Sequence, residues 1–398
     1  MKNRIVYADH SATTAVRPEV KEAMLPYLEA QFGNPSSIYE IAQQSKAAIE
    51  AARTQVAKGI GAKAREIYFT SGGTEADNWA IKGAAEIYRA KNKTGGHIIT
   101  SAVEHHAVLH TCEFLETQGF RVTYLPVDAE GTVSIQALKE AFSEDTILVS
   151  IMMANNEIGT INPIAEIGQI CREHKVPFHV DAVQALGTLP IDVEAMQIDM
   201  LSMSAHKLYG PKGVGALYVR KGIRLTPLMH GGAQESKKRA GTENVPGIVG
   251  FGKAVELATA DMEERGEKLK VMRDYLIDTI LEKVPHVRLN GSRTNRLPGH
   301  VNFSFSFIEG ESMLMLLDMN GIYASSGSAC TSGSLDPSHV LMAIGLPHEI
   351  AHGSLRLTFG RENTMEDMEY IIEKLPPIVE RLREMSPLYA DYLKNGNQ

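Results

Sequence analysis

Short apolar runs alternate with longer amphipathic segments between residues 65 and 220. The runs are four to six residues long and rich in β-branched side chains, which is typical of buried strands, and the segments between them repeat apolar residues at helical spacings. This alternation predicts an α/β domain with a mostly parallel sheet. The predicted strands are Ile67–Thr70, His97–Ser101, Val122–Leu125, Ile147–Met152, Phe178–Asp181, Met200–Met203 and Ala216–Val219.

Two of the helices between these strands have recognisable starts. Ser134 carries a hydroxyl that can cap a helix, which predicts a helix over Ile135–Phe142. Pro163 precedes the predicted helix Ile164–His174, in which apolar residues recur every three or four positions.

The pattern changes near residue 260. A charged helix is predicted from Gly252 to about Lys283, and a shorter α+β pattern follows it. The last predicted helix, Thr364–Met385, contains Pro376-Pro377 and should bend or break there, because proline removes a helical hydrogen bond. The chain has 398 residues, which is more than one core usually serves. We expect a large domain over residues 15–260 and a smaller α+β domain formed by residues 1–14 and 261–398.

Candidate chemistry begins where two of the strands end. Lys207 follows the strand Met200–Met203 in a glycine-rich turn, and Asp181 and Gln184 follow the apolar run that begins at Val176. An amine and a buried carboxylate together suit pyridoxal 5′-phosphate (PLP). Lysine forms a Schiff base with the aldehyde of this cofactor, and the carboxylate keeps its pyridine nitrogen protonated.

Three further strand ends offer polar groups. The turn Thr70–Asn78 opens a helix, so its backbone N–H groups and hydroxyls could bind a phosphate. His105 could stack on a cofactor ring, or it could be an ordinary structural histidine. Asn155, which begins Asn155-Asn156-Glu157-Ile158-Gly159, could contact the ring hydroxyl or the substrate, or belong to a simple turn.

The three cysteines differ in their surroundings. Cys112 and Cys171 lie in helical, partly apolar stretches, where they are expected to pack as small buried hydrophobic residues. Cys330 lies in the run Ser325–Ser334, which consists of small residues and glycines, so an exposed loop and a nucleophilic role are predicted. An odd number of widely spaced cysteines fits neither a disulfide framework nor a zinc site of the CxxC kind.

Arg356 alternates with apolar residues in a predicted strand. Its planar guanidinium could grip a carboxylate at two points, or it could form a surface ion pair.

Composition restricts the class of partner. The formal net charge is −8, and the one basic cluster is the short Lys237-Lys238-Arg239, so direct nucleic-acid binding is not expected. No window of eighteen apolar residues predicts a membrane span, and Met1–Arg4 leads into charged residues too early for a signal peptide. We therefore expect a cytoplasmic protein that acts on a small substrate or on a protein partner.

The whole chain resembles the NifS/IscS-type cysteine desulfurases, which are PLP enzymes of the aspartate-aminotransferase fold type. The Ser-Gly-Ser-Ala-Cys-Thr-Ser-Gly run around Cys330 resembles this branch and not the SufS-like one. His10 stands where other members often carry asparagine. The matching motifs are Asp9–Thr14, Phe32–Ser37, Thr70–Asn78, Glu104-His105, Asn155–Gly159, Asp181–Gln184, Ser204–Lys207, Arg239–Asn244, Ser326–Gly333 and Arg356.

The resemblance implies fold type I, with a mostly parallel seven-stranded sheet in the large domain and the catalytic cysteine loop in the smaller one. It implies that Lys207 holds PLP and moves protons, and that Cys330 takes sulfur from L-cysteine as a persulfide and leaves L-alanine. Other implied contacts are Asp181 with the pyridine nitrogen, Gln184 with the phenolic oxygen, His105 over the ring, Thr74, Ser204 and His206 with the phosphate, and Asn155 and Arg356 with the substrate carboxylate.

The resemblance also implies a homodimer in which Thr242 reaches the phosphate of the neighbouring subunit. It implies a protein that accepts the sulfur, such as an iron–sulfur scaffold or a tRNA-thiolating enzyme.

Three alternatives stay open. A selenocysteine lyase or an aminotransferase could share the fold, although an aminotransferase has no use for Cys330 on a loop. An inactive homologue could serve only as a docking scaffold, which the presence of Lys207 and Asp181 disfavours. A zinc site that uses His105, His106 and a cysteine is the weakest alternative, and no metal is expected.

Overall fold

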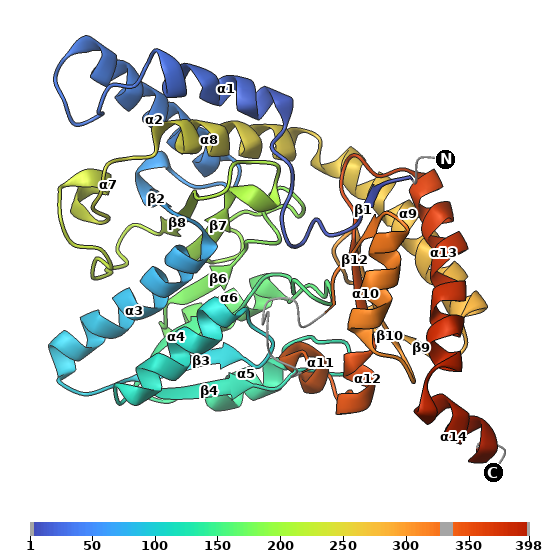
Figure 1. Cartoon of the computed structure of the whole chain (residues 1–398). Helices are drawn as coiled ribbons and strands as arrows, with labels where there is room; N and C mark the ends of the chain where they lie inside the picture. Colours follow the sequence, from blue (N-terminus) through green and yellow to red (C-terminus); the bar gives the residue numbers. More distant parts are fainter. Residues whose placement is uncertain (1–3, 327–336, 396–398) are drawn as a thin grey trace.

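The computed structural model describes residues 4–326 and 337–395. Its central sheet has seven strands in the order β2-β8-β7-β6-β5-β3-β4 (Figure 1). The neighbouring strands from β7 to β4 are all parallel, and only β8 is antiparallel to its two neighbours. The predicted mostly parallel seven-stranded sheet is therefore confirmed. The strands are β2 (Ile67–Thr70), β3 (His97–Ser101), β4 (Arg121–Leu125), β5 (Thr146–Ser150), β6 (Phe178–Asp181), β7 (Met200–Ser204) and β8 (Gly215–Val219).

Helices cover both faces of this sheet. Both faces carry apolar side chains that must be buried, because successive side chains along a strand point to opposite faces. Leu148 and Met200 belong to one apolar core, whereas their neighbours Val149 and Leu201 belong to another. The first core is closed by α3 (Gly73–Asn92) and α4 (His106–Thr117). The second is closed by α1 (Pro18–Glu29), α2 (Glu40–Lys58), α5 (Ile135–Ala141), α6 (Ile164–His174) and α8 (Val245–Ala260).

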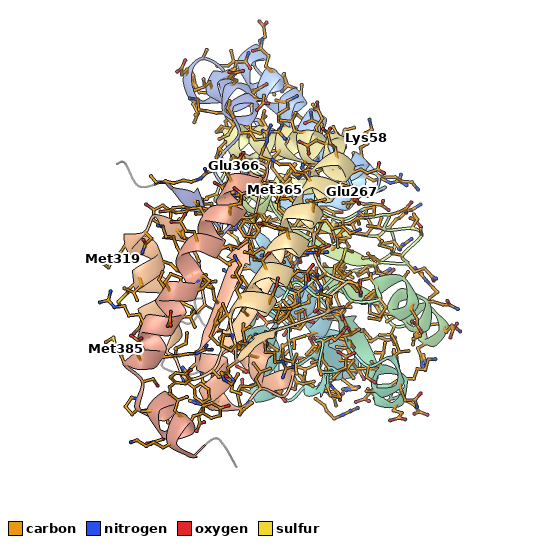
Figure 2. All side chains as sticks on the ribbon, turned by 90° about the vertical axis from the view of Figure 1, so that its right-hand side faces the viewer. Lys58, Glu267, Met319, Met365, Glu366 and Met385 are labelled. Atoms are coloured by element: carbon orange, nitrogen blue, oxygen red, sulfur yellow. The ribbon has the colours of Figure 1, made fainter. Side chains whose placement is uncertain are left out.

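A second group of elements surrounds a three-stranded antiparallel sheet in the order β12-β10-β9. Its core is closed by the helices α9, α10 and α13. Figure 2 shows these helices from outside, with Met319 and Met385 at the surface, where they are 73% and 72% exposed. The elements are β9 (Val287–Leu289), β10 (His300–Phe305), β12 (Ser354–Thr358), α9 (Met262–Lys283), α10 (Gly310–Met319), α11 (His339–Ala343), α12 (His348–His352), α13 (Met365–Glu384) and α14 (Pro387–Asn395).

The beginning of the chain belongs to this second group. Strand β1 (Val6–Tyr7) pairs in parallel with β11 (Ile322–Tyr323). The backbone of Ala8 then accepts a hydrogen bond from Thr358 N at 2.8 Å. These contacts support a division into residues 15–260 on one side and 1–14 with 261–398 on the other, which stays a prediction.

The helix predicted from Gly252 to Lys283 is instead two helices, α8 and α9, that meet at Asp261. The backbone of Asp261 is non-helical, with φ −105° and ψ 10°. Its carboxylate contacts Arg17 Nη1 at 3.1 Å and also Arg265. These ion pairs fix Asp261 at the junction of the two helices, which the apolar periodicity does not reveal.

The predicted break of the last helix is wrong, because α13 continues through Pro376 and Pro377, and the predicted bend stays a prediction. Leu375 and Val379, on either side of the prolines, are buried against the second core. Burial of this face offsets the hydrogen bonds that the two prolines remove. No helix among residues 4–326 and 337–395 is long and apolar enough to cross a membrane.

Candidate active site

A cavity of about 470 Å³ lies where the central sheet meets the second group of elements. Strands β6 and β7 end at it, as expected for a ligand site in an open parallel sheet. The site residues predicted from the sequence that line this cavity are Thr74, His105, Asp181, Gln184, Ser204, His206, Lys207 and Arg356.

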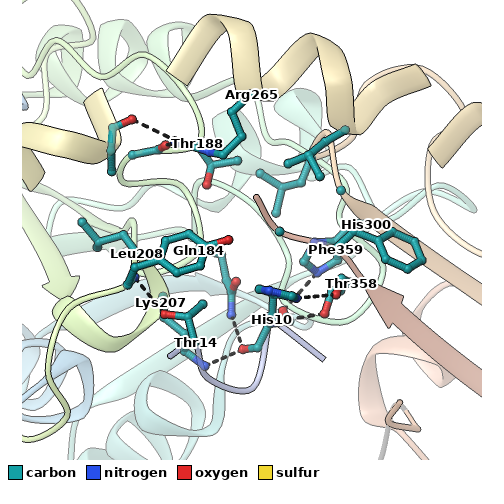
Figure 3. A pocket seen from close by; sticks show the side chains of 18 residues that line it. His10, Thr14, Gln184, Thr188, Lys207, Leu208, Arg265, His300, Thr358 and Phe359 are labelled. Atoms are coloured by element: carbon teal, nitrogen blue, oxygen red, sulfur yellow. Dashed lines mark hydrogen bonds between the residues drawn. The ribbon is translucent and has the colours of Figure 1, made fainter. Parts of the chain in front are cut away.

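Lys207 reaches the cavity because β7 ends at Ser204 and a single 3₁₀ turn, η2 (Ala205–Lys207), follows it. Its Nζ donates hydrogen bonds to the backbone oxygens of Ser11 at 2.5 Å and Ala12 at 2.9 Å. Gln184 Nε2 donates to the same Ser11 oxygen at 3.0 Å (Figure 3). The N-terminal segment therefore places the amine and the amide beside each other. A smaller cavity of about 60 Å³ shares these side chains.

Asp181 ends β6 with its side chain buried at the cavity. Burial raises the pKa of its carboxyl to about 6, against the lowering effects of the Val183 N–H, which donates to Oδ1 at 2.9 Å, and of Lys207. A second carboxyl, Asp77, is fully buried in the same wall, and its pKa is raised by burial and by Asp181. A cationic group beside Asp181 would remove most of this electrostatic cost.

His105 is the N-cap of α4, and its Nδ1 accepts a hydrogen bond from Ala107 N at 3.1 Å. Burial, followed by the charge of Lys207, lowers the pKa of the imidazole to about 4. The ring is therefore neutral near pH 7. Because Nδ1 is the acceptor, its hydrogen is on Nε2, and His105 acts as an N–H donor in this state.

The start of α3 forms the seat for an anion. The helix begins at Gly73, directly after β2, so its first N–H groups are unpaired within the helix and the helix dipole favours a negative group there. A Cβ on Gly73 would lie 2.6 Å from Val183 Cγ2, which explains the glycine. Ser204 and His206 line the same cavity, and His206 Nδ1 lies 3.1 Å from Thr13 Oγ1.

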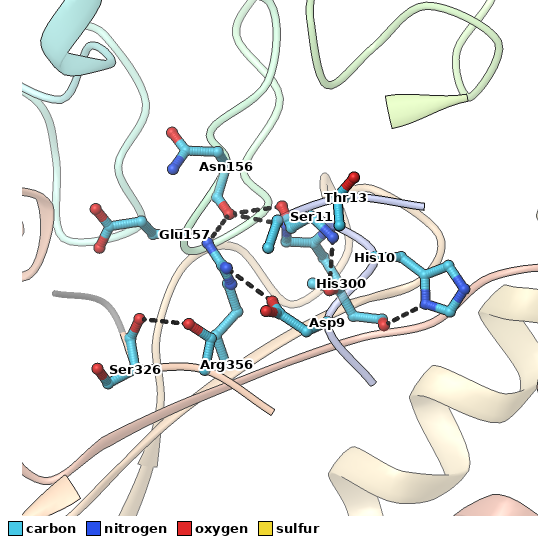
Figure 4. A network of polar contacts seen from close by, with 12 residues as sticks. Asp9, His10, Ser11, Thr13, Asn156, Glu157, His300, Ser326 and Arg356 are labelled. Atoms are coloured by element: carbon cyan, nitrogen blue, oxygen red, sulfur yellow. Dashed lines mark hydrogen bonds and ion pairs between the residues drawn. The ribbon is translucent and has the colours of Figure 1, made fainter. Parts of the chain in front are cut away.

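Arg356 lies opposite, on β12, and is almost fully buried. Its Nη2 contacts Asp9 Oδ1 at 2.8 Å, and its Nη1 donates to the backbone oxygen of Asn156 at 3.1 Å (Figure 4). Its Nε is buried and has no hydrogen-bond partner among the described residues. Arg356 lines the cavity, and a carboxylate there could bind its guanidinium, since the two groups match in geometry.

Comparison with known proteins agrees with this arrangement. A family model described as aminotransferase class-V matches residues 6–371. The chain is 62% identical over 387 residues to the cysteine desulfurase IscS of Methanosarcina thermophila. The matched region covers 97% of this chain and 95% of that protein. It is 59% identical to the cysteine desulfurase IscS of Clostridium botulinum over the full length of both. A solved NifS-like protein superposes with a TM-score of 0.89 at 38% identity, over 95% of this chain and 100% of that one.

The chain belongs to the cysteine desulfurases of the class-V aminotransferase family. It is therefore a PLP-dependent enzyme of fold type I that acts on L-cysteine.

The residues of this desulfurase fit PLP. The cavity joins an amine, a buried carboxyl and an anion seat at a helix start, which match the aldehyde, the ring nitrogen and the phosphate of the cofactor. Arg356 lines the same cavity, so its guanidinium can meet the carboxylate of an amino-acid substrate there.

Three predicted site residues are not among those that line the cavity. The Asn155 amide donates to Val103 O at 2.9 Å and accepts from Glu157 N at 2.8 Å, and the neighbouring Asn156 lines the cavity instead. Thr242 is exposed and is not one of the residues that line this cavity. Cys330 lies outside the described residues. Cys112 and Cys171 are buried in α4 and α6, as predicted, and burial raises the pKa of both thiols.

Sequence reasoning gave no role to several residues that line the cavity. Asp9 and Ser11 were noted only as parts of a motif, although they follow a strand as Lys207 and Asp181 do. Strand β1 has only two residues, so the apolar pattern could not reveal it. The cavity residues with polar side chains to which sequence reasoning assigned no role of their own are Asp9, Ser11, Asp77, Asn156 and Ser325.

Proposed function

We propose that this desulfurase works as a cytoplasmic homodimer that transfers the sulfur of L-cysteine to Cys330, releases L-alanine and passes the sulfur to an acceptor protein. The observation that carries this proposal is that Lys207, Asp181 and Arg356 converge on one cavity, at whose edge the cysteine-bearing segment begins. An iron–sulfur scaffold or a tRNA-thiolating enzyme is the proposed kind of acceptor.

PLP, when bound, supplies an electrophilic carbon for the substrate amine and a ring that accepts an electron pair. Lys207 would hold it and then move a proton with its Nζ. Asp181 would act as a carboxylate toward the ring nitrogen, because the positive charge there compensates for burial of the carboxylate. Gln184 would donate toward the phenolic oxygen.

The phosphate would bind at the start of α3. Thr74 is exposed there, Ser204 is the last residue of β7, and His206 lies in the turn that follows it. His105 would cover the ring, since it caps α4 at the edge of the cavity. To accept a proton, His105 would first have to break the hydrogen bond that its Nδ1 accepts from Ala107 N, because Nε2 already carries a hydrogen.

Arg356 would hold the substrate carboxylate with its guanidinium, which lines the cavity. Asp9 already neutralises part of its charge, so the substrate would share the guanidinium with Asp9. Asn155 stays a prediction, because its amide would have to leave Val103 and Glu157.

The sulfur step would use Cys330 as a thiolate. Its Sγ would bond to the substrate sulfur as the carbon–sulfur bond breaks. The electron pair of that bond would stay with the carbon, and a proton would complete alanine. Ser325 lines the cavity, and its backbone pairs with that of Arg356 through two hydrogen bonds. Cys330 follows Ser325 by five positions in the sequence, and its own placement lies outside the described residues.

The homodimer and the role of Thr242 rest on the resemblance to the cysteine desulfurases, which implies that Thr242 acts on the phosphate in the neighbouring subunit. Thr242 is exposed and is not among the residues that line the cavity of its own subunit, which is compatible with this role.

The experiment that tests this function is incubation of the protein with L-cysteine and a reductant, with alanine and sulfide measured together. Equal amounts of both are expected. Activity on L-selenocysteine without comparable activity on L-cysteine would instead support a selenocysteine lyase.

A further inference from the structure

We propose that Glu235 and Arg239 are positioning residues, which hold residues 234–243 in the conformation that presents Thr242 to the partner subunit. Two ion pairs, Arg53–Glu235 and Arg239–Glu75, carry this role. The proposal rests on the homodimeric function proposed above and assigns the residues on which the contact across the dimer depends.

The segment begins in an unfavourable backbone conformation. Glu235, Ser236 and Lys237 have φ angles of 44°, 57° and 66°, all in the left-handed region, although none of them is glycine. This conformation is unfavourable for residues that carry a Cβ, which comes too close to the following carbonyl oxygen. Such a turn persists only where the surrounding structure holds it, and turns of this kind are common at functional sites.

Glu235 holds the turn on the body of the protein. Its two oxygens accept from Arg53 Nη1 at 2.7 Å and Nη2 at 2.8 Å, and Oε2 also accepts from Phe69 N at 2.9 Å. Arg53 Nη1 donates further to the backbone oxygen of Ile67. Glu235 is buried, so this two-point ion pair is little screened by water. It attaches the turn to α2 and to the edge strand β2.

Arg239 makes the second attachment, three residues before Thr242. Its Nε and Nη2 donate to the two oxygens of Glu75 at 2.8 and 3.0 Å. Glu75 lies in the first turn of α3 and accepts from Ser71 N at 2.7 Å. Burial alone would raise the pKa of Glu75, but the hydrogen bonds from Arg239 and Ser71 outweigh it and lower the pKa, so the pair stays ionised.

The two attachments connect Thr242 to the phosphate seat of its own subunit. Glu75 follows Thr74, the residue proposed to bind phosphate in that seat. Gly241, with a φ of 108°, then turns the chain before the exposed Thr242. Each subunit therefore uses the start of its own α3 to hold the residue that completes the seat of its partner.

The first test compares two ligands of the apoenzyme, PLP and pyridoxal, which lacks the phosphate. Glu235→Gln keeps the size of the side chain and removes its charge. We expect PLP to bind roughly tenfold more weakly, which is the usual cost of one charge-assisted contact, with the affinity for pyridoxal unchanged. Glu194→Gln is the matched control, because it breaks the surface pair Arg220–Glu194 (2.6 Å) and should change neither affinity.

An equal loss for both ligands would overturn the proposal, because a merely structural role affects them alike. If Glu235→Gln does not fold, Arg239→Lys serves instead, since it keeps the charge and loses the two-point contact. The same selective loss of PLP affinity is expected, and unchanged binding of PLP would contradict the proposal.

Mixed dimers test whether the effect crosses the interface. One subunit carries Lys207→Ala together with Glu235→Gln, and the other is unchanged, so cofactor is held covalently only in the unchanged subunit. That site should bind PLP roughly tenfold more weakly than in a mixed dimer with Lys207→Ala alone. Equal affinities would refute the positioning role.

Thr242→Ala distinguishes the contact of Thr242 across the dimer from the positioning role of Glu235 and Arg239. If this variant leaves PLP affinity unchanged, the contact across the dimer is wrong. If it lowers PLP affinity while Glu235→Gln and Arg239→Lys do not, the contact stands and the positioning role is wrong.

Discussion

At the scale of single residues, Arg356 shows most directly how burial prepares a side chain for a ligand. Two of its nitrogens are paired with Asp9 and Asn156, and Nε is buried without a partner among the described residues. Arg356→Lys keeps the positive charge and loses the planar geometry. We expect L-cysteine to bind more weakly by about 2–5 kcal/mol, or roughly thirtyfold to several thousandfold.

A spectral titration of the PLP-loaded variant with L-cysteine measures this effect. Arg288→Lys is the matched control, because Arg288 is exposed on β9 of the same sheet. Unchanged binding in Arg356→Lys would remove Arg356 from the substrate site.

Lys207 leads to a second prediction at this scale. Lys207→Ala should abolish the visible absorbance of a covalent link to PLP, because the amine at the end of β7 is lost. Borohydride reduction and peptide mapping of the unchanged protein should place the pyridoxyl group on Lys207. The neighbouring Lys212 is exposed, and finding the group there would overturn the assignment.

Cys330→Ala should separate cofactor chemistry from sulfur transfer. The variant should bind PLP and change its spectrum with L-cysteine, since these depend on Lys207 and Arg356. It should form little alanine and no persulfide, as measured by amino-acid analysis and mass spectrometry. Cys112→Ala and Cys171→Ala should remain active, because both thiols are buried in helices. Near-normal alanine formation by Cys330→Ala would favour a selenocysteine lyase or another PLP lyase.

At the scale of elements, two helix caps make a matched pair. Ser134 caps α5 by accepting from Ala137 N at 3.2 Å, and Ser338 caps α11 by accepting from Leu341 N at 3.2 Å. Ser338 also donates to the carboxylate of the buried Glu157, whose pKa is raised to about 7 by burial.

The two alanine variants should therefore differ in cost. Ser134→Ala should lower the free energy of unfolding by about 1 kcal/mol, the usual value of a cap. Ser338→Ala should cost about 1–3 kcal/mol more, because it also takes a hydrogen bond from a buried carboxyl. Denaturant unfolding of both variants measures this difference, and equal losses would show that the contact with Glu157 contributes nothing.

At the scale of the whole molecule, stability should depend on pH through Glu104. Its Oε1 accepts from Ser101 Oγ at 2.6 Å and Met152 N at 3.0 Å, and its Oε2 is buried without a partner among the described residues. Burial raises its pKa to about 8. The unfolded value is roughly 4.3, so between these values the folded chain binds more protons than the unfolded one, and Glu104 makes stability fall as pH rises.

Glu104→Gln stays neutral and keeps an oxygen for both donors. The apoenzyme variant should therefore gain stability relative to the unchanged protein as pH rises from 5 to 8, by about a few kcal/mol in total. Urea unfolding at pH 5, 6.5 and 8 measures this gain. Glu267→Gln, at an exposed position on α9, is the control for the loss of a surface carboxylate. A constant difference for Glu104→Gln would show that the carboxyl is charged throughout.

Sequence patterns predicted the central sheet because each strand and helix carries its own period of apolar residues. Strands β2, β3 and β6 begin and end where the apolar runs do, and α6 follows Pro163 as expected. The break at Asp261 and the unbroken α13 escaped prediction, because contacts with Arg17 and burial around Leu375 decide them.

For the candidate site, the apolar runs were sufficient to predict which polar groups follow strand ends. Lys207, Asp181 and His105 could be named because parallel strands deliver their carboxyl ends to one edge of a sheet. Only the tertiary structure decided what faces them from far along the chain. Asp9 meets Arg356 across 347 positions, and Asn156, not Asn155, lines the cavity. These contacts depend on packing between distant segments, and no local period of apolar residues encodes that packing.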